Sequence, residues 1–218
     1  MKGLIYRDLL TFYRRLTKGT YIQEFIFFFI FLLVLRNRFS CITYLLCVLP
    51  LNMSSMPTVM KEMDVNQKGM RAALLYPVST KELVGSRYLS VFLQQLYYVA
   101  IMLVYVTLHF FIYGTYSFGD YLMLCGLSWM LGILFASFNL IACFGSSLNT
   151  AAIVYMGIWV LVAMGYFIPT IFLDVDFALI LQMNPVFLLG GACLAVVLSA
   201  GFTYLISLKI LTKQLQKA

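Results

Sequence analysis

Charged residues are scarce in this sequence, whose 218 residues include 15 lysines and arginines and 8 aspartates and glutamates, or 11% of the chain. In a soluble domain roughly a quarter of the residues are charged. Apolar residues make up 63%, and runs of about 20 residues pass without a charge, which is the length that a helix needs to cross a bilayer. The composition excludes a water-soluble domain and predicts an all-α membrane protein. Six crossing helices would leave roughly 100 residues for ends and loops, so residues 1–218 are expected to form a single transmembrane domain.

Residues that could act in catalysis or bind a metal or a nucleotide are also rare. His109 is the one histidine, the five cysteines show no C-x-x-C spacing, and there is no G-x-x-x-x-G-K-[ST] motif. A metal site or an intramembrane hydrolase needs a cluster of ionisable groups within the spans, so we expect neither an enzyme nor a metal or cofactor in this chain. A chain without a P-loop cannot cradle nucleotide phosphates in that manner, so ATP and Mg²⁺ would be bound by a partner. The net charge of +7 does not indicate nucleic acid, because the cations border apolar runs and form no basic face.

Six apolar segments have the length and composition of membrane-spanning helices. Their expected boundaries are residues 20–35, 39–60, 88–113, 121–145, 151–173 and 186–207. The second segment carries Pro50 and Pro57, which remove backbone hydrogen bonds, so a kinked or broken helix is expected there. Residues 174–185 are too apolar for a plain loop and too short to cross, which favours a re-entrant segment.

Basic residues are divided unevenly between the two sides of this six-span arrangement. Thirteen of the fifteen lie on the side of the two termini, and Arg36 and Arg38 are the exceptions. Cytoplasmic loops retain lysine and arginine, so both termini are predicted to be cytoplasmic and residues 174–185 extracellular. Residues 1–18 place apolar side chains at helical spacing with cations on the opposite side, which predicts an amphipathic helix in the membrane interface.

Glu24 falls within the first turns of the first predicted span. An ionised carboxylate there is costly unless it is paired or close to the headgroups. One interpretation is interfacial pairing with Arg15 or Lys18. The other is a switching ion pair, in which Glu24 pairs with the cytoplasmic ends of other spans and the pair changes when the protein changes state.

Methionines recur at steps of three, four and three along the second span, so one helix face is lined by flexible thioethers. Plain packing or a dimer seam is one explanation of this stripe. The other is an adaptable apolar wall along which an amphipathic substrate slides. The residues of this candidate substrate path are Asn52, Met53, Ser55, Met56 and Met60, with Met63 at the end of the stripe.

Residues 61–87 are predicted to form a long polar loop on the cytoplasmic side. Apolar residues between 70 and 76 have the spacing of a short helix, which Pro77 would end. Ser79 and Glu82 make an S-x-x-E capping box, which predicts a new helix from Thr80 that runs without interruption into the third span. A short helix hinged to a rigid extension of a spanning helix is a lever on which a cytoplasmic machine could push.

The sequence of this loop resembles that of a known family. It reads Lys68-Gly69, Leu75-Tyr76-Pro77-Val78-Ser79, Lys81-Glu82-Leu83-Val84 and Arg87-Tyr88 after an acidic residue. This order is similar to the L-P-V-S-R-K-E-I-V-x-x-K-Y stretch of compact ABC-2 type transporter permeases, with Tyr76, Thr80 and Arg87 as mild departures. Asn184-Pro185 also resembles the family's pattern before the last span.

The resemblance implies a membrane subunit of an ABC exporter in the bacterial plasma membrane, with residues 1–18 as its elbow helix. Such a subunit pairs with two copies of a separate ATP-binding subunit and with a second copy of itself or a paralogue. Residues 68–76 would be the coupling helix that docks in the ATPase. The residues implied for coupling are Lys68, Gly69, Met70, Arg71, Leu74, Tyr76 and Glu82. The smallest members resemble exporters of phenol-soluble modulins, which favours export of an amphipathic peptide or another hydrophobic substrate.

Two other classes of function stay open at this stage. A passive channel, or another polytopic membrane protein without an ATPase partner, would need no cytoplasmic lever. Channels use rings of polar residues in several spans, and the scarcity of polar residues here counts against one. An intramembrane enzyme would need the ionisable cluster that the sequence does not contain.

Overall fold

The computed structural model describes residues 2–15, 18–35, 38–66, 79–145 and 147–216. The described residues form helices and no β-strands, which confirms the predicted all-α class. Segments η1 and η2 are π-helical and η3 is a 3₁₀ helix. The elements are α1 (Lys2–Arg15), α2 (Lys18–Phe29), η1 (Ile30–Val34), α3 (Arg38–Thr43), η2 (Tyr44–Val48), α4 (Leu49–Ser54), α5 (Met56–Asn66), α7 (Thr80–Tyr113), α8 (Phe118–Gly145), α9 (Leu148–Phe172), η3 (Phe177–Gln182) and α10 (Pro185–Leu215).

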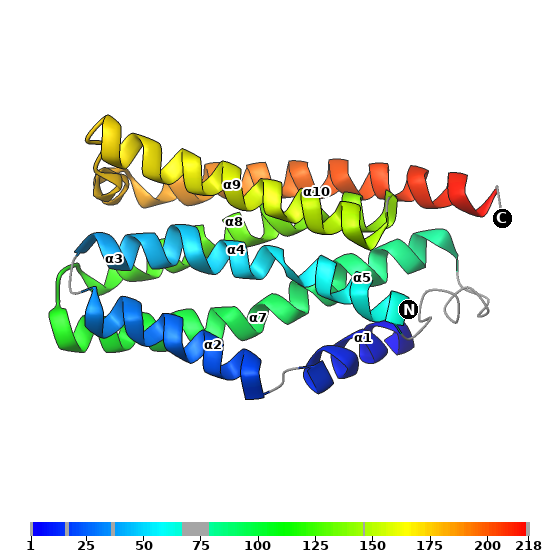
Figure 1. The fold of residues 1–218 in the computed structure, drawn as a ribbon. Coiled ribbons are helices and arrows are strands. Elements are labelled where there is room, and N and C mark those ends of the chain that lie inside the picture. The colour runs from blue at the N-terminus through cyan, green and yellow to red at the C-terminus, as the bar shows by residue number, and fades with distance from the viewer. Residues whose placement is uncertain (1, 16–17, 36–37, 67–78, 146, 217–218) are drawn as a thin grey trace.

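The long helices run side by side in alternating directions, and the two chain ends lie at the same end of the bundle (Figure 1). We call this the terminal end, and the opposite end, with the turn between α7 and α8 and with η3, the outer end. Helix α1 lies at the terminal end, set apart from the bundle axis (Figure 1).

Five helical stretches are long and apolar enough to cross a membrane. They cover Ser40–Asn66, Thr80–Tyr113, Phe118–Gly145, Leu148–Phe172 and Pro185–Gln214. The first predicted span appears as a shorter helix, α2 continued by η1, whose apolar part is Glu24–Val34. A sixth crossing at this helix stays a prediction.

The second span is broken as its prolines predicted. It begins as α3, passes through the π-helical η2, and divides into α4 and α5 around Ser55. The hydroxyl of Ser54 donates to the Leu51 carbonyl at 2.7 Å and that of Ser55 to the Asn52 carbonyl at 2.6 Å. Pro57 has no N–H to donate to the Met53 carbonyl, which interrupts the backbone hydrogen bonds, and the two serine hydroxyls bond to carbonyls of the turn before it.

The core lies where α8 packs against α4, α7 and α10. Helices α4 and α8 approach closely at Gly132, where a Cβ atom would lie 3.0 Å from the Met53 Cβ atom and closer still to its sulfur. Small residues allow such approaches between helices in lipid, where dispersion contacts replace the hydrophobic effect. Helices α9 and α10 form an outer layer (Figure 1) and leave many of their apolar side chains exposed.

Helix α7 begins at Thr80 as predicted, with the capping box of Ser79 and Glu82 complete. The Ser79 hydroxyl accepts a hydrogen bond from the Glu82 amide at 3.2 Å, and the Glu82 carboxylate accepts one from the Ser79 amide at 3.1 Å. Helix α5 extends to Asn66, so residues 61–66 are helical where the sequence predicted loop. Apolar periodicity fades at Lys61, but a helix persists because packing of one face is enough to hold it.

The outer end is closed by η3, within residues 174–185. Asp176 caps η3 by accepting a hydrogen bond from the Ala178 amide at 2.8 Å. The Phe177 ring stacks on the Tyr166 ring of α9 at 4.7 Å. These contacts hold the segment against the bundle, and its re-entrant placement stays a prediction.

Candidate functional site

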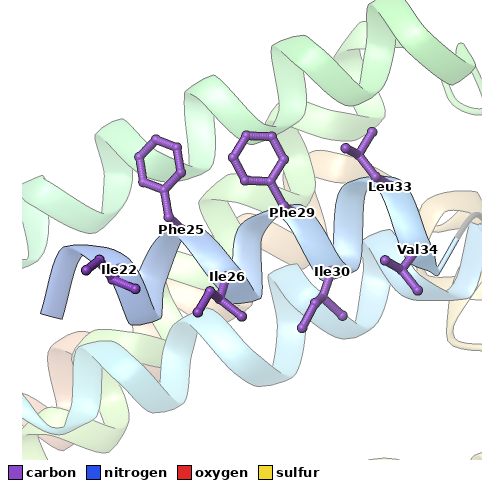
Figure 2. A pocket seen from close by; sticks show the side chains of 7 residues that line it. All are labelled: Ile22, Phe25, Ile26, Phe29, Ile30, Leu33 and Val34. Atoms are coloured by element: carbon purple, nitrogen blue, oxygen red, sulfur yellow. The ribbon is translucent and has the colours of Figure 1, made fainter. Parts of the chain in front are cut away.

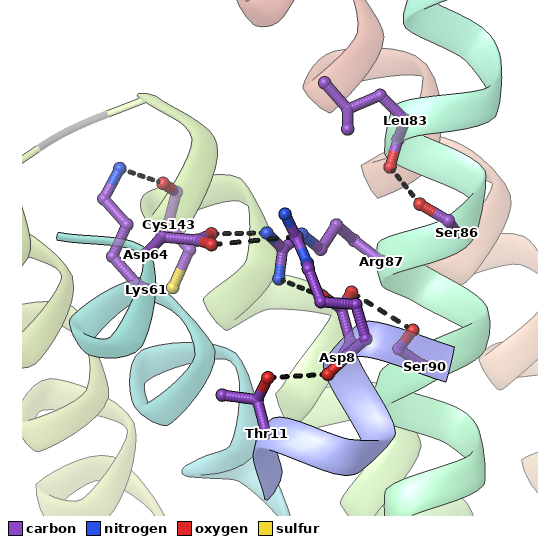
Figure 3. A network of polar contacts seen from close by, with 10 residues as sticks. Asp8, Thr11, Lys61, Asp64, Leu83, Ser86, Arg87, Ser90 and Cys143 are labelled. Atoms are coloured by element: carbon purple, nitrogen blue, oxygen red, sulfur yellow. Dashed lines mark hydrogen bonds and ion pairs between the residues drawn. The ribbon is translucent and has the colours of Figure 1, made fainter. Parts of the chain in front are cut away.

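A buried arginine lies near the start of α7, at the terminal end of the bundle. Arg87 is 5% exposed. Its Nη1 atom lies 3.2 Å from Asp8 Oδ1 of α1, and its Nη2 atom pairs with Asp64 Oδ2 of α5 (Figure 3). A single guanidinium thus binds carboxylates from two other helices.

Asp8 itself is buried because it lies on the apolar face of α1. It is four residues from Leu4 and from Phe12, and these three residues are all under 9% exposed. Its carboxylate accepts hydrogen bonds from Arg7 Nη2 at 2.9 Å and from the Ser90 hydroxyl of α7 at 3.3 Å. Arg7 Nη2 also lies 3.9 Å from Asp64 Oδ1.

Arg7, Asp8, Asp64 and Arg87 form what we call the ion cluster. Its formal charges are two positive and two negative, so they balance. Removing charges from water is costly, and the attraction between them repays this cost only when the geometry is good and the remaining donors are satisfied. Removal of one member leaves an uncompensated buried charge, so the cluster holds α1, α5 and α7 in one arrangement.

The position of the ion cluster along the chain bears on its function. Asp64 lies just before residues 67–78, the segment between the described parts of α5 and α7, and Arg87 lies two turns into α7. The Asp64–Arg87 pair therefore joins the two helices that lead into and out of that segment. A displacement of the segment would be passed to α5 and α7 together, and through Asp8 to α1.

Helix α8 is tied to the same end of the bundle through its last carbonyl groups. Lys61 Nζ of α5 donates to the Cys143 carbonyl at 2.7 Å (Figure 3), and Gln214 Nε2 of α10 donates to the Phe144 carbonyl at 3.1 Å. The last four carbonyls of a helix have no intrahelical partner, and cations are favourable at this negative end. These bonds extend the connection from the ion cluster region to α8 and α10.

Comparison with known proteins identifies the family of the chain. Residues 3–212 match the family model described as ABC-2 family transporter protein. The chain belongs to the ABC-2 transporter family. No curated protein and no solved structure matches it. As an ABC-2 family member it is an integral membrane protein, of the kind that serves as the membrane subunit of an ABC transporter and pairs with an ATP-binding subunit.

Most residues implied for coupling in this ABC-2 chain lie outside the described residues. These are Lys68, Gly69, Met70, Arg71, Leu74 and Tyr76. Glu82 is described, and its carboxylate serves the capping box of α7. The coupling role of the segment stays a prediction.

Glu24 is paired with a tyrosine in the structure. The Tyr98 hydroxyl of α7 donates to Glu24 Oε1 at 3.1 Å, and Glu24 is half-buried. Pairing with Arg15 or Lys18 would involve side chains outside the described part of the chain. The ion pairs that join α1, α5 and α7 are formed by other residues, those of the ion cluster.

The methionines of the candidate substrate path are packed inside one chain. Met53, Met56 and Met60 are at most 5% exposed, while Asn52 and Ser55 are half-buried. In this conformation the methionines contribute to the core, as the packing alternative holds. A substrate could reach their thioethers only after the helices separate, and the path stays a prediction.

The ion cluster was missed by reasoning from the sequence, although a signal for it exists. An acidic residue that falls in register with the apolar positions of an amphipathic helix, as Asp8 does between Leu4 and Phe12, must find a cation when that face is buried. The partners themselves are far apart in the chain. His109, the one histidine, is buried with Nδ1 2.7 Å from the Tyr121 hydroxyl. No group of His, Cys, Asp or Glu among the described residues could hold a metal ion.

Proposed function

We propose that this chain is the transmembrane permease subunit of an ATP-driven exporter, which forms the substrate path with a second copy and is energised by separate ATP-binding subunits. The observation that carries the proposal is the ion cluster at the flanks of residues 67–78. A channel or a passive membrane protein has no need for such a connection. A subunit that is pushed by an ATPase does need one.

The mechanical argument depends on which helices the ion cluster joins. When the ATP-binding subunit moves residues 68–76, α5 and α7 are displaced as a pair because Arg87 holds Asp64. Helix α1 follows because Arg87 also holds Asp8. Packed cores and interfaces change between discrete arrangements, so a small push at the terminal end is turned into a movement of whole helices.

The proposal includes six crossings, with both termini cytoplasmic. Helix α2 and η1 lie at the edge of the bundle and run toward its outer end beside α3 (Figure 1). Between Ile22 and Val34 their outward side chains are apolar and exposed (Figure 2), and line a shallow open groove beside the helix. The residues of this face are Ile22, Phe25, Ile26, Phe29, Ile30, Leu33 and Val34.

Such a face is stable in contact with hydrocarbon and unfavourable in water. Its position along the whole of α2 and η1 supports a helix that crosses the membrane. The crossing is short, so flanking cations would reach to the headgroups. Helix α5, the start of α7 and the end of α10 lie at the terminal end (Figure 1), and the lysines in these parts of the sequence, Lys61, Lys81 and Lys209, support a cytoplasmic assignment for that end.

The proposed cargo is an amphipathic peptide or another hydrophobic substrate. The aromatic content of 17% and the thioether stripe suit an apolar cargo that enters from the membrane.

Copurification tests this function. The tagged chain, extracted from its native membrane in mild detergent, is expected to bring down a protein that binds and hydrolyses ATP. Leu74→Asp places a charge in the proposed docking segment, at a cost of several kcal/mol if it stays unpaired, and is expected to release that protein. Phe118→Asp at the outer end is the matched control and should retain it. Recovery of the chain without any ATPase from wild-type membranes would contradict the proposal.

A further inference from the structure

Glu24 lies on the side of α2 that faces the bundle, opposite the apolar face of Figure 2. The partner of its carboxylate among the described residues is Tyr98, a neutral group that is 4% exposed. Ionisable residues within spans are costly and line substrate or ion routes when they occur. The ion pairs that Arg7 and Arg87 form in the ion cluster do not involve Glu24.

Further buried polar groups with spare hydrogen-bonding capacity occur on α7 and η2. Gln94 is one turn from Tyr98 on the same side of α7, is 2% exposed, and has no partner for either its amide nitrogen or its amide oxygen. The hydroxyl of Tyr44, in η2, is also buried without a partner. Buried polar groups are nearly always hydrogen-bonded, so their accumulation here indicates a place where a polar ligand is accepted.

The surroundings of Glu24 are rich in aromatic rings. The Tyr97 and Tyr98 rings meet edge to face at 5.3 Å. The Phe28 ring, one turn beyond Glu24 on α2, lies 5.4 Å from the Tyr105 ring, which lies 4.4 Å from the Tyr44 ring of η2. Elements α2, α7 and η2 thus combine one carboxylate with several aromatic rings.

A carboxylate among aromatic rings is the arrangement that recognises an organic cation. The carboxylate supplies a charge-assisted hydrogen bond or an ion pair. The ring faces attract the same cation through their quadrupoles, and the attraction is larger where water is excluded. An anionic or neutral ligand would gain neither contribution and would meet the repulsion of Glu24 or leave it unpaired.

We propose that the carboxylate of Glu24 is the binding site for the alkylammonium group of an amphipathic substrate. This site adds a specificity for cations to the proposed export function. The inference rests on that function only in calling the bound molecule a substrate. Both a lysine side chain of an amphipathic peptide and a lipophilic amine carry this group.

The test is binding to the full-length chain in nanodiscs of phosphatidylcholine, which lack anionic lipid, without ATP or any partner. The probes are an amphipathic helical peptide with lysines on its polar face, the same peptide with glutamines in their place, and dodecyltrimethylammonium with dodecanol as its uncharged counterpart. The wild-type chain is expected to bind each cationic probe about tenfold or more tightly than its neutral counterpart, as a hydrogen bond to a charged group implies. A preference for the peptide pair alone identifies a lysine side chain as the group bound, and a preference in both pairs identifies any alkylammonium.

Two variants separate charge from structure. Glu24→Gln keeps the size of the side chain and a hydrogen-bond acceptor for Tyr98, and it should abolish the preference for the cationic probes. Tyr98→Phe keeps the carboxylate and should retain most of the preference. Asp120→Asn, at the outer end, is the control for loss of a carboxylate elsewhere and should bind as the wild type does.

Unchanged preference in Glu24→Gln would overturn the site, as would an equal loss in Tyr98→Phe, which would indicate a packing effect. The site and the proposed function fail in different ways. If cation binding depends on Glu24 while the chain shows no ATP-driven transport, the site stands and the export function fails. If ATP-driven export proceeds in a chain without any cation preference, the function stands and the site fails.

Discussion

At the scale of single residues, the stability of the terminal end depends on a few buried charges. Arg87 neutralises Asp8 and Asp64 at once, and both carboxylates belong to other helices. Breaking a buried ion pair costs more than its formation gains, because the remaining charge stays in a low dielectric without its partner. The arginine is therefore the residue on which the joint packing of α1, α5 and α7 depends.

Arg87→Met retains much of the side-chain volume but leaves two carboxylates without their cation. We expect it to destabilise the folded chain by about 3–5 kcal/mol, measured as a fall in the unfolding midpoint in detergent. Lys81→Met on the same helix is the control, because Lys81 is exposed, and it should have little effect. Equal stability of the two variants would show that the ion cluster does not hold the helices.

Gly132 is the residue on which the close approach of α4 and α8 depends. A Cβ atom there would lie 3.0 Å from the Met53 Cβ atom, so Gly132→Ala should destabilise by about 1–3 kcal/mol through overpacking. Met53→Ala in the same chain should recover part of the loss by making room. Gly191→Ala on α10 meets no atom within 4 Å and serves as the control in the same unfolding assay. A neutral Gly132→Ala would show that α4 and α8 can separate at no cost.

At the scale of elements, local signals in the sequence determined several boundaries correctly. The start of α7 follows from Ser79 and Glu82, and the break between α4 and α5 follows from Pro57 with its neighbouring hydroxyls. These features depend on neighbouring residues alone. The π-helical turns η1 and η2 and the extension of α5 to Asn66 could not be predicted, because they depend on which helices pack beside them.

The same distinction separates the predicted from the missed parts of the candidate site. The segment that leads into α7 could be located through its polarity and its motif. The ion cluster brings together Asp8, Asp64 and Arg87. These residues are far apart in the sequence, so no local pattern shows that they are in contact. A single sequence shows that Asp8 lies on an apolar face, but the three-dimensional arrangement of helices decides which cation reaches it.

Ser79→Ala tests the capping of α7. The loss of an N-cap hydroxyl costs about 0.5–2 kcal/mol, and the first turn of α7 should fray. Hydrogen exchange of the amides of residues 80–83 is expected to accelerate while the rest of α7 stays protected. Ser147→Ala, which removes the cap of α9, should have its effect on α9 alone. Unchanged exchange at residues 80–83 would argue that tertiary packing fixes the start of α7 without its cap.

At the scale of the whole molecule, the arrangement of helices predicts which chain segments lie on the same side of the membrane. The ends of α1 and α10 lie at the terminal end, while Ser117 lies at the outer end (Figure 1). If α2 crosses the membrane, Gly3 is on the cytoplasmic side with Lys81. The ion pair of Asp8 with Arg87 also holds α1 at the terminal end, so a topology with Gly3 on the other side would require α1 to leave the contacts seen in the structure.

Single cysteines in a cysteine-free background decide between these topologies. An impermeant thiol reagent applied from outside should modify Ser117→Cys and leave Gly3→Cys and Lys81→Cys unmodified until the membrane is opened. A Cβ atom at Gly3 meets nothing within 4 Å, so the substitution should be tolerated. Modification of Gly3→Cys from outside would contradict both the six crossings and the contact of α1 with α7.

The central claim, that an ATPase drives transport through this chain, is tested most directly by peptide accumulation in inside-out proteoliposomes. The vesicles contain the chain together with the ATP-binding subunit that copurifies with it, and the cargo is a labelled amphipathic peptide. We expect accumulation that requires ATP, that is lost in Leu74→Asp although the variant inserts and folds, and that persists in Phe118→Asp. Accumulation without ATP, or at an unchanged rate in Leu74→Asp, would contradict the account.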